Sequence, residues 1–114
     1  MAIINDKAFY GTERKYIVEI VSPGFDMVRD EFEIELKRGN ISKVFQKSDL
    51  VVETEQVTIN NEQVEKTNYY LCFDTKDFGK GIITAIITAH VPDSDFDDGI
   101  RDEVDKFDLL NVMW

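Results

Sequence analysis

Residues 31–37 read Glu-Phe-Glu-Ile-Glu-Leu-Lys, so apolar and charged side chains alternate through this stretch without a break. Successive side chains of a β-strand point to opposite faces of its sheet, and this alternation therefore predicts a strand with one buried and one solvated face. Phe32, Ile34 and Leu36 are the side chains predicted to point into the core. The stretch thus favours a fold built from half-buried strands.

Further strand signals lie on both sides of this stretch. β-branched and aromatic residues, which pack well on a pleated surface, predict short strands over residues 16–21, 42–46, 50–54, 69–73 and 82–91. Alternate side chains of the last two segments are assigned to the core, which adds the set Tyr69, Leu71, Phe73, Ile83, Ala85, Ile87, Ala89 and Val91.

Two segments carry weaker patterns. Residues 56–59 are predicted to form one arm of a hairpin that turns at the Asn-Asn pair 60–61. Residues 104–112 mix strand alternation with a helical spacing of apolar residues, but the repeated Asp residues and the preceding Gly99 disfavour a helix. A final strand is therefore predicted there.

Short strands separated by turn clusters, without a long amphipathic helix, predict an all-β fold. The predicted architecture is one antiparallel immunoglobulin-like β-sandwich of about seven strands over residues 1–114, although the Cys, Trp and Cys signature of that class is absent. Residues 1–12 are expected to be an N-terminal arm, and residues 92–103 an acidic loop. A length of 114 residues is close to the commonest size of a single domain.

The charge of the chain disfavours several classes of partner. It has 13 basic and 23 acidic residues, and a net charge of -10 repels phosphate backbones and anionic lipid head groups alike. Neither nucleic acid nor a membrane is therefore an expected partner. No apolar run reaches the roughly 18 residues of a membrane span, and the start MAIINDKAF lacks the pattern of a secretory signal. Cys72 stands alone and allows neither an internal disulfide nor a thiolate metal site.

The acidic turn at residues 93–99 carries four carboxylates and a glycine, and it resembles the start of a calcium loop. Calcium takes oxygen ligands from alternating positions of such a loop, so the weak candidates for metal ligands are Asp93, Asp95 and Asp97. The spacing then departs from the pattern, because Asp98 and Val104 stand where Gly and Glu are needed. A solvated acidic turn is the favoured interpretation, and no metal or cofactor is expected.

Nucleophilic catalysis assisted by histidine would require His90, the single histidine, with a serine or Cys72 as its partner. By strand parity His90 lies on the face of Thr84 and Thr88, where a surface histidine is expected. No pair of carboxylates stands out for sugar hydrolysis. No catalytic residue is predicted, the protein is expected not to be an enzyme, and a small hydrolase is the least favoured class.

Candidate protein-binding residues lie in the last quarter of the chain. Residues 92–108 hold eight acidic side chains and two basic ones, a net charge of -6 that favours a basic groove on a partner. Phe96 either projects from the acidic turn as an aromatic anchor or tucks under its own loop. Met113 and Trp114 either fold back on the core or add exposed apolar area for a neighbouring subunit.

Two stretches of the sequence resemble a known group of proteins. They are KYIVEIVSPGFDMVRDEFEIELKRG at residues 15–39 and NYYLCFDTKDFGKGIITAIITAHVPDSDFDDGIRDEVDKFDLLNV at residues 68–112. Both are similar to small accessory structural proteins of tailed phages and prophages of gut bacteria, crAss-like phages among them. The resemblance implies an immunoglobulin-like sandwich that decorates the capsid, or sits in the tail or baseplate, by binding other virion proteins or copies of itself.

The expected function is therefore that of a non-enzymatic structural protein of a phage or prophage virion, made in the host cytoplasm and located in the particle, where it is part of an oligomeric assembly. An acidic domain suits the outer surface of a particle, away from packaged DNA that would repel it. The alternative, from a different class, is a stand-alone binding or adhesion module for a carbohydrate or for a calcium-dependent protein partner.

Overall fold

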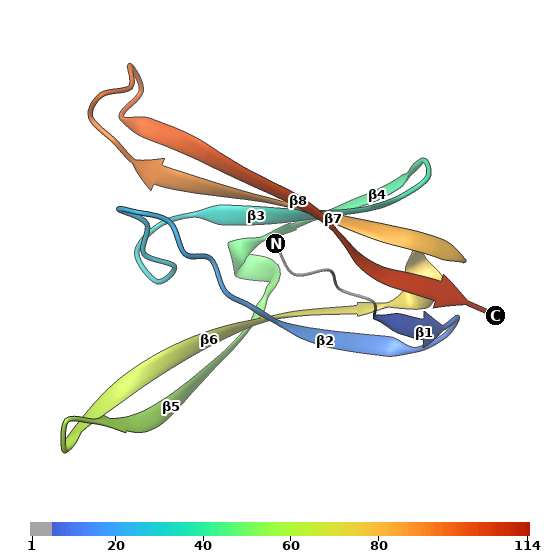
Figure 1. Cartoon of the computed structure of the whole chain (residues 1–114), viewed down its shortest axis with the longest axis horizontal. Helices are drawn as coiled ribbons and strands as arrows, with labels where there is room; N and C mark the ends of the chain where they lie inside the picture. Colours follow the sequence, from blue (N-terminus) through green and yellow to red (C-terminus); the bar gives the residue numbers. More distant parts are fainter. Residues whose placement is uncertain (1–5) are drawn as a thin grey trace.

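Two β-sheets form most of the protein in the computed structural model, which describes residues 6–114 (Figure 1). The elements are β1 (Lys7–Phe9), β2 (Glu13–Val18), β3 (Phe32–Arg38), β4 (Ile41–Gln46), the 3-10 helix η1 (Lys47–Asp49), β5 (Val51–Ile59), β6 (Glu62–Asp74), the 3-10 helix η2 (Thr75–Asp77), β7 (Gly81–Pro92) and β8 (Ile100–Met113). The all-β prediction is confirmed, with eight strands in the described residues where about seven are predicted. No helix within residues 6–114 is long and apolar enough to cross a membrane.

One pair of strands departs from the predicted antiparallel arrangement. The larger sheet has the order β1-β8-β7-β3-β4 and the smaller one the order β2-β6-β5. β1 runs parallel to β8, with Ala8 opposite Val112, whereas the other pairs are antiparallel. The prediction is wrong at this pair because Ala8 becomes buried beside the last strand, so part of the predicted arm 1–12 joins the sheet. Residues 1–5 of that arm lie outside the described residues.

The core lies between the two sheets. Phe32, Ile34 and Leu36 of β3 are fully buried, as the alternation in residues 31–37 predicts. The ring of Phe32 meets Tyr69 of β6 edge to face, with 5.8 Å between ring centroids, a geometry that aromatic pairs favour. Every other predicted core residue is buried except Ile87, which is only partly buried because it lines an open groove.

An extra residue in β8 explains the mixed sequence pattern of residues 104–112. Ile83 of β7 pairs with Leu110, but the next residue, Thr84, pairs with Asp108, so Leu109 is inserted between them. Such a bulge changes which positions of a strand face inward, and both Leu109 and Leu110 are buried as a result. The predicted final strand is confirmed, and the bulge is the reason that simple alternation fails there.

Two predicted boundaries are wrong. The strand predicted over residues 16–21 ends at Val18, because the Ile20 N–H donates to the sulfur of Met27 and not to a neighbouring strand. The acidic loop predicted over residues 92–103 is shorter, because Pro92 of β7 already pairs with Ile100 of β8.

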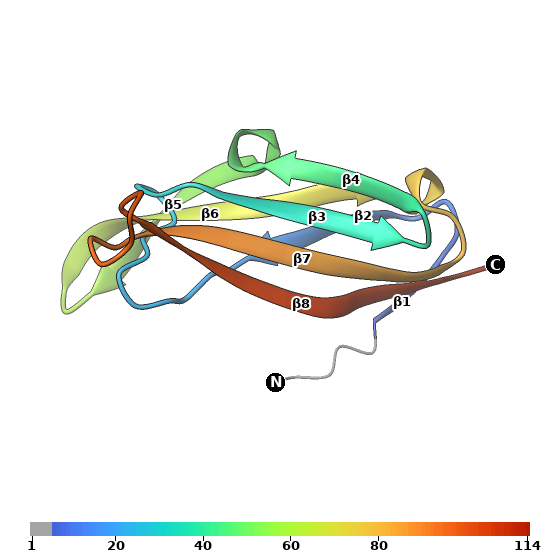
Figure 2. The same cartoon turned by 90° about the horizontal axis from the view of Figure 1, so that it is seen from above.

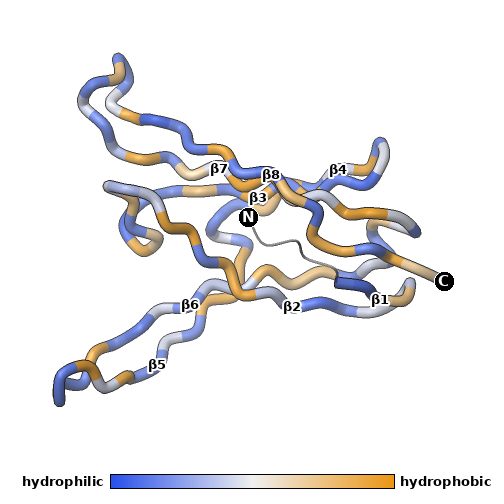
Figure 3. The backbone as a smooth tube through the Cα atoms, in the orientation of Figure 1, coloured by the Kyte–Doolittle hydropathy of each residue, from blue (hydrophilic) through white to orange (hydrophobic). Residues whose placement is uncertain are grey.

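Two hairpins extend beyond the two-sheet body at the same end of the molecule (Figures 1 and 2). The β5–β6 arm comprises residues 53–66, and the β7–β8 arm comprises residues 92–102, which lie beyond the last pair of β3 and β7. Asn60 and Asn61 have positive φ values of 51° and 65°, as a two-residue type I′ turn requires, so the predicted hairpin is confirmed. Nearly all residues of both arms are exposed, and the β7–β8 arm is mainly hydrophilic toward its tip (Figure 3).

Candidate functional site

The negative charge of the protein is concentrated on the two arms. Together they hold nine of the 23 acidic residues and two of the 13 basic ones, and so they carry -7 of the net charge of -10. The remainder of the chain, with fourteen acidic and eleven basic residues, carries only -3. Because both arms project at one end, that end presents a strongly negative potential to solvent.

The tip of the β7–β8 arm is a loop closed by its own hydrogen bonds. The Asp93 N–H donates to the Gly99 carbonyl at 2.9 Å, and the Gly99 N–H donates to the Phe96 carbonyl at 2.9 Å. One carboxylate oxygen of Asp93 accepts the Asp95 N–H at 3.0 Å, while the other pairs with Arg101. The Asp95 N–H, followed by the Arg101 guanidinium, holds the pKa of Asp93 below its ordinary value.

The three weak metal candidates do not converge in this loop. Asp93 is paired with Arg101, and Asp95 turns its backbone N–H toward Asp93. Asp97 is exposed. Within residues 6–114, no group of three or more His, Cys, Asp or Glu side chains is arranged to hold a metal ion. The loop therefore presents its remaining carboxylates to solvent as charges.

The three predicted protein-binding residues are exposed or partly exposed, but they do not share one surface. Phe96 is 48% exposed at the tip of the β7–β8 arm, which fits the projecting alternative. Met113 and Trp114 lie at the other end of β8, and a strand of 14 residues separates the two sites by about 45 Å. Trp114 is 71% exposed, and its ring lies against Tyr10 with 4.7 Å between centroids. Phe9, which is also exposed, is opposite Met113 in the β1–β8 register, at the end of the molecule away from the arms.

His90 lies on the outer face of the larger sheet between two carboxylates. Its Nε2 is 2.7 Å from Oε2 of Glu33 on β3, and its Nδ1 is 2.7 Å from Oδ1 of Asp102 on β8. Asp102 first, and then Glu33, raises the pKa of His90 because a protonated imidazole donates to both. Both ring nitrogens are thereby directed at carboxylates and not at a serine or at Cys72. Parity predicts the correct face, but the two partners depend on strand register.

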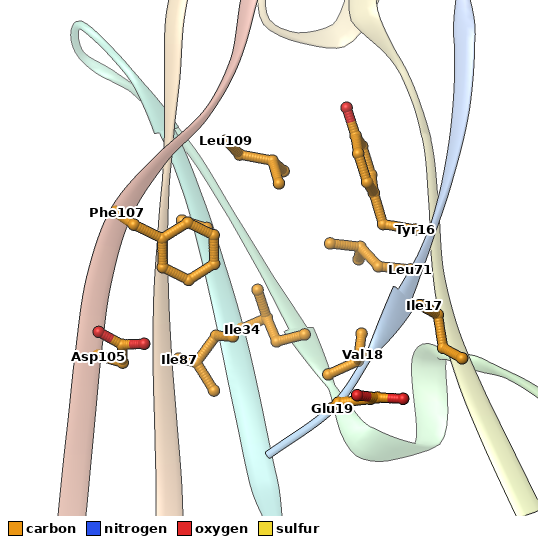
Figure 4. Close-up of a pocket in the computed structure, with 11 residues that line it drawn as sticks. Tyr16, Ile17, Val18, Glu19, Ile34, Leu71, Ile87, Asp105, Phe107 and Leu109 are labelled. Carbon is orange, nitrogen blue, oxygen red and sulfur yellow. The ribbon is translucent and has the colours of Figure 1, made fainter. Parts of the chain in front are cut away.

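A groove opens between the sheets on the side where β2 faces β8 (Figure 4). Its volume is about 290 Å³, and most of its lining is apolar, including Tyr16, Val18, Leu71, Ile87, Phe107 and Leu109. A second hollow of about 280 Å³ continues it and shares Glu19, Ile87 and Asp105. The two hollows form one trough along the side of the molecule. Sequence parity places Ile87 on the inward face but carries no information on whether two sheet edges close over it.

The hydroxyl of Tyr16, a β2 residue that lines the groove, is hydrogen-bonded to Asp6 at the start of the described chain. It donates to Oδ2 of Asp6 at 2.5 Å, and the Nε–H of Arg14 donates to the same hydroxyl at 3.2 Å. Burial, and then the hydrogen bond to Asp6, raises the pKa of Tyr16 to about 12. The hydroxyl therefore stays protonated and keeps β2 linked to the residue that precedes β1.

Comparison of this chain with protein-family models, with curated proteins and with solved structures found no match. Within residues 6–114, the candidate binding features are the two acidic arms, the exposed aromatic residues at both ends of β8, and the groove between β2 and β8.

Proposed function

We propose that this protein is a non-enzymatic assembly protein whose two acidic arms grip a positively charged protein partner. The observation that carries this proposal is the placement of -7 of the net charge of -10 on two hairpins at one end. Charge of one sign on projecting elements speeds the encounter with an oppositely charged surface and selects against acidic partners.

The arms gain little stability from their own packing, which supports a role in binding. Two-stranded ribbons with both faces in water are marginally stable alone, and the β5–β6 arm has no buried residue along its 53–66 stretch. Apolar side chains nevertheless remain exposed on the arms, among them Ile59, Val64, Phe96 and Ile100. Such side chains interspersed with carboxylates suit a protein interface that combines steering with apolar contact.

The biological setting we propose is a phage or prophage virion. The protein would be an immunoglobulin-like capsid decoration or a tail or baseplate accessory, made in the host cytoplasm and bound to other virion proteins. The all-β, two-sheet body and the resemblance of residues 15–39 and 68–112 to such accessory proteins support this setting. Mass spectrometry of purified particles from a producing culture tests it: peptides of this chain are expected in the particles, and their restriction to the soluble lysate would contradict the proposal.

The arm mechanism is tested with a decalysine peptide as a stand-in for a basic partner. The triple variant Glu62→Gln, Glu65→Gln, Asp97→Asn removes three charges from the arms, and Glu13→Gln, Glu31→Gln, Asp77→Asn removes three from the body. Calorimetric titration at low salt is expected to show a loss of about tenfold in affinity for the arm variant and a much smaller loss for the body variant. Equal losses would mean that net charge alone, and not the arms, attracts the peptide.

A further inference from the structure

The strand β8 has an edge that the described residues leave largely unpaired. On one side it pairs with β7 along its length, from Ile100 opposite Pro92 to Val112 opposite Gly81. On the other side, within residues 6–114, only β1 pairs with it, and only from Asn111 to Met113. Within the described part of the chain, no strand therefore lies beside residues 100–110 on this side, and residues 103–109 of this stretch border the groove.

The direction of the backbone groups along this edge follows from the β7–β8 register. The His90 N–H donates to the Glu31 carbonyl, away from β8, so His90 and Asp102 are an opposed pair that exchanges no backbone hydrogen bonds. The N–H and C=O groups of Asp102 then point away from β7, toward the unpaired edge. Hydrogen-bonding direction alternates along an antiparallel pair, so Val104 and Lys106 point the same way.

The other half of this edge already receives a strand. The Asn111 N–H donates to the Asp6 carbonyl at 3.0 Å, and the Tyr10 N–H donates to the Met113 carbonyl at 2.6 Å. β1 thus extends the sheet beyond β8 over three residues. A second strand placed on residues 100–110 would continue the same edge and cover the groove.

The apolar lining of the groove suits the side chains on one face of such a strand. Ile87 and Phe107 are partly buried and line it, so apolar side chains from an added strand would shield them from water. The side chains that alternate with these apolar ones would point to the outer face of the sheet, where β8 presents Asp102 and Asp108 against one basic residue, Lys106. Charge complementarity therefore favours an occupant in which basic residues accompany the apolar ones.

We propose that an extended segment of the protein partner, with alternating apolar and basic residues, adds as a strand to residues 100–110 of β8 and fills the groove between β2 and β8. This inference deepens the proposed function, because it names the form in which a basic partner is held. The main-chain hydrogen bonds of the added strand supply affinity, and its apolar side chains in the groove supply selectivity.

Two nine-residue peptides with the same composition test the proposal. In one, Lys and Val alternate, and in the other five Lys residues precede four Val residues. Both carry the same charge for the arms, but only the alternating peptide can present one apolar face as a strand. It is expected to bind about tenfold more tightly than the block peptide, and to protect the Asp102, Val104 and Lys106 amides from hydrogen exchange.

A matched pair of variants distinguishes the contribution of the backbone N–H to peptide affinity from that of the side chain. Val104→Pro removes an N–H that points toward the unpaired edge, and Val104→Ala removes the same exposed side chain but keeps the N–H. The proline variant is expected to lose about tenfold in affinity for the alternating peptide, while the alanine variant stays within about twofold. Circular dichroism establishes that both are folded; if the proline variant is not, the exchange protection in the parent protein decides.

The outcomes distinguish this inference from the proposed function. Equal affinity for the two peptides without protection of the β8 amides overturns strand addition but leaves the acidic arms as the binding element. Failure of both peptides and of decalysine to bind at low salt overturns both. Protection of the same amides in the protein alone, as a monomer or as a dimer in sedimentation, means that the chain itself or a second copy occupies the edge, and the proposal is then wrong.

Discussion

The body and the arms are made from the same strands, yet they differ in almost every physical property. In the body, β6 and β7 bury alternate side chains between the sheets, whereas the arm residues of β5, β6 and β8 leave both faces in water. The arms carry -7 of the net charge of -10, although they hold fewer than a quarter of the residues. One part of a strand can therefore stabilise the fold while another part of the same strand binds a partner. A substitution in the body should change the free energy of unfolding, and a substitution in an arm should change the affinity for the partner.

The largest expected effect comes from a pair of isoleucines on opposite sides of this division. Ile83 is fully buried in β7, and Ile83→Ala should lower the free energy of unfolding by about 2–5 kcal/mol through lost burial and a new cavity. Ile59 is 54% exposed at the end of β5, and Ile59→Ala should cost less than about 0.5 kcal/mol. Urea denaturation measures both; similar losses would mean that the arm is packed as tightly as the body.

A smaller contrast is expected between two threonines. The hydroxyl oxygen of Thr75, which is fully buried, accepts the N–H groups of Gly11 at 2.8 Å and Thr12 at 3.0 Å. Thr75→Val deprives these backbone groups of a partner and should cost about 2 kcal/mol. Thr58 in the arm accepts only the Gln63 side chain at 2.8 Å, in water, and Thr58→Val should change stability by less than about 0.5 kcal/mol. Thermal unfolding of the two variants, compared with the parent, provides the measurement.

A third and weaker effect depends on pH at the root of the β7–β8 arm. The pKa of His90 is raised in the folded protein, so its contribution to stability is fully present below the unfolded pKa of about 6.5 and is lost as pH rises through the folded pKa. His90→Gln should therefore cost about 1 kcal/mol or less near pH 5.5, and less again at pH 8.5. Urea denaturation at both pH values measures whether the loss of stability is larger at the lower pH. A purely steric effect of the substitution would be the same at both pH values.

Local sequence patterns predict the body because its strands follow simple rules. Alternation in residues 31–37 identifies Phe32, Ile34 and Leu36 as core residues. In the β5–β6 arm, the Asn-Asn pair identifies the hairpin for the same reason, since both patterns depend on neighbouring residues alone. Leu109 breaks the rule, because a bulge is decided by the strand opposite it. The final strand can still be predicted there, but not which of its residues face inward.

The candidate site is less predictable from the sequence, because it depends on the relative positions of strands that are distant along the chain. The concentration of charge in residues 92–108 is visible in the sequence, but the projection of its tip at the same end as the β5–β6 arm depends on how the two sheets are assembled. The groove is absent from any local pattern, since it exists only where β2 and β8 remain apart. The separation of Phe96 from Trp114 is different, because it follows from the single extended strand between them.

The smallest expected effect is a difference in decalysine affinity between variants of these two aromatic residues. Both are exposed, so Phe96→Ala and Trp114→Ala should each change the free energy of unfolding by less than about 0.5 kcal/mol. Phe96 stands among the acidic residues of the β7–β8 arm, where a lysine drawn to the arm can also lie over its ring. An exposed cation–π contact contributes about 0.5–1 kcal/mol, so Phe96→Ala should weaken decalysine binding about two- to fivefold.

Trp114 provides the control for this prediction. It lies at the other end of β8, with the Lys80 ammonium already 5.8 Å from its ring centroid, so Trp114→Ala should leave decalysine affinity unchanged. Titration of both variants under the conditions used for the arm variants makes the comparison direct. If Trp114→Ala weakens binding as much as Phe96→Ala does, the peptide is not held at the acidic end, and the division between a stabilising body and binding arms is wrong.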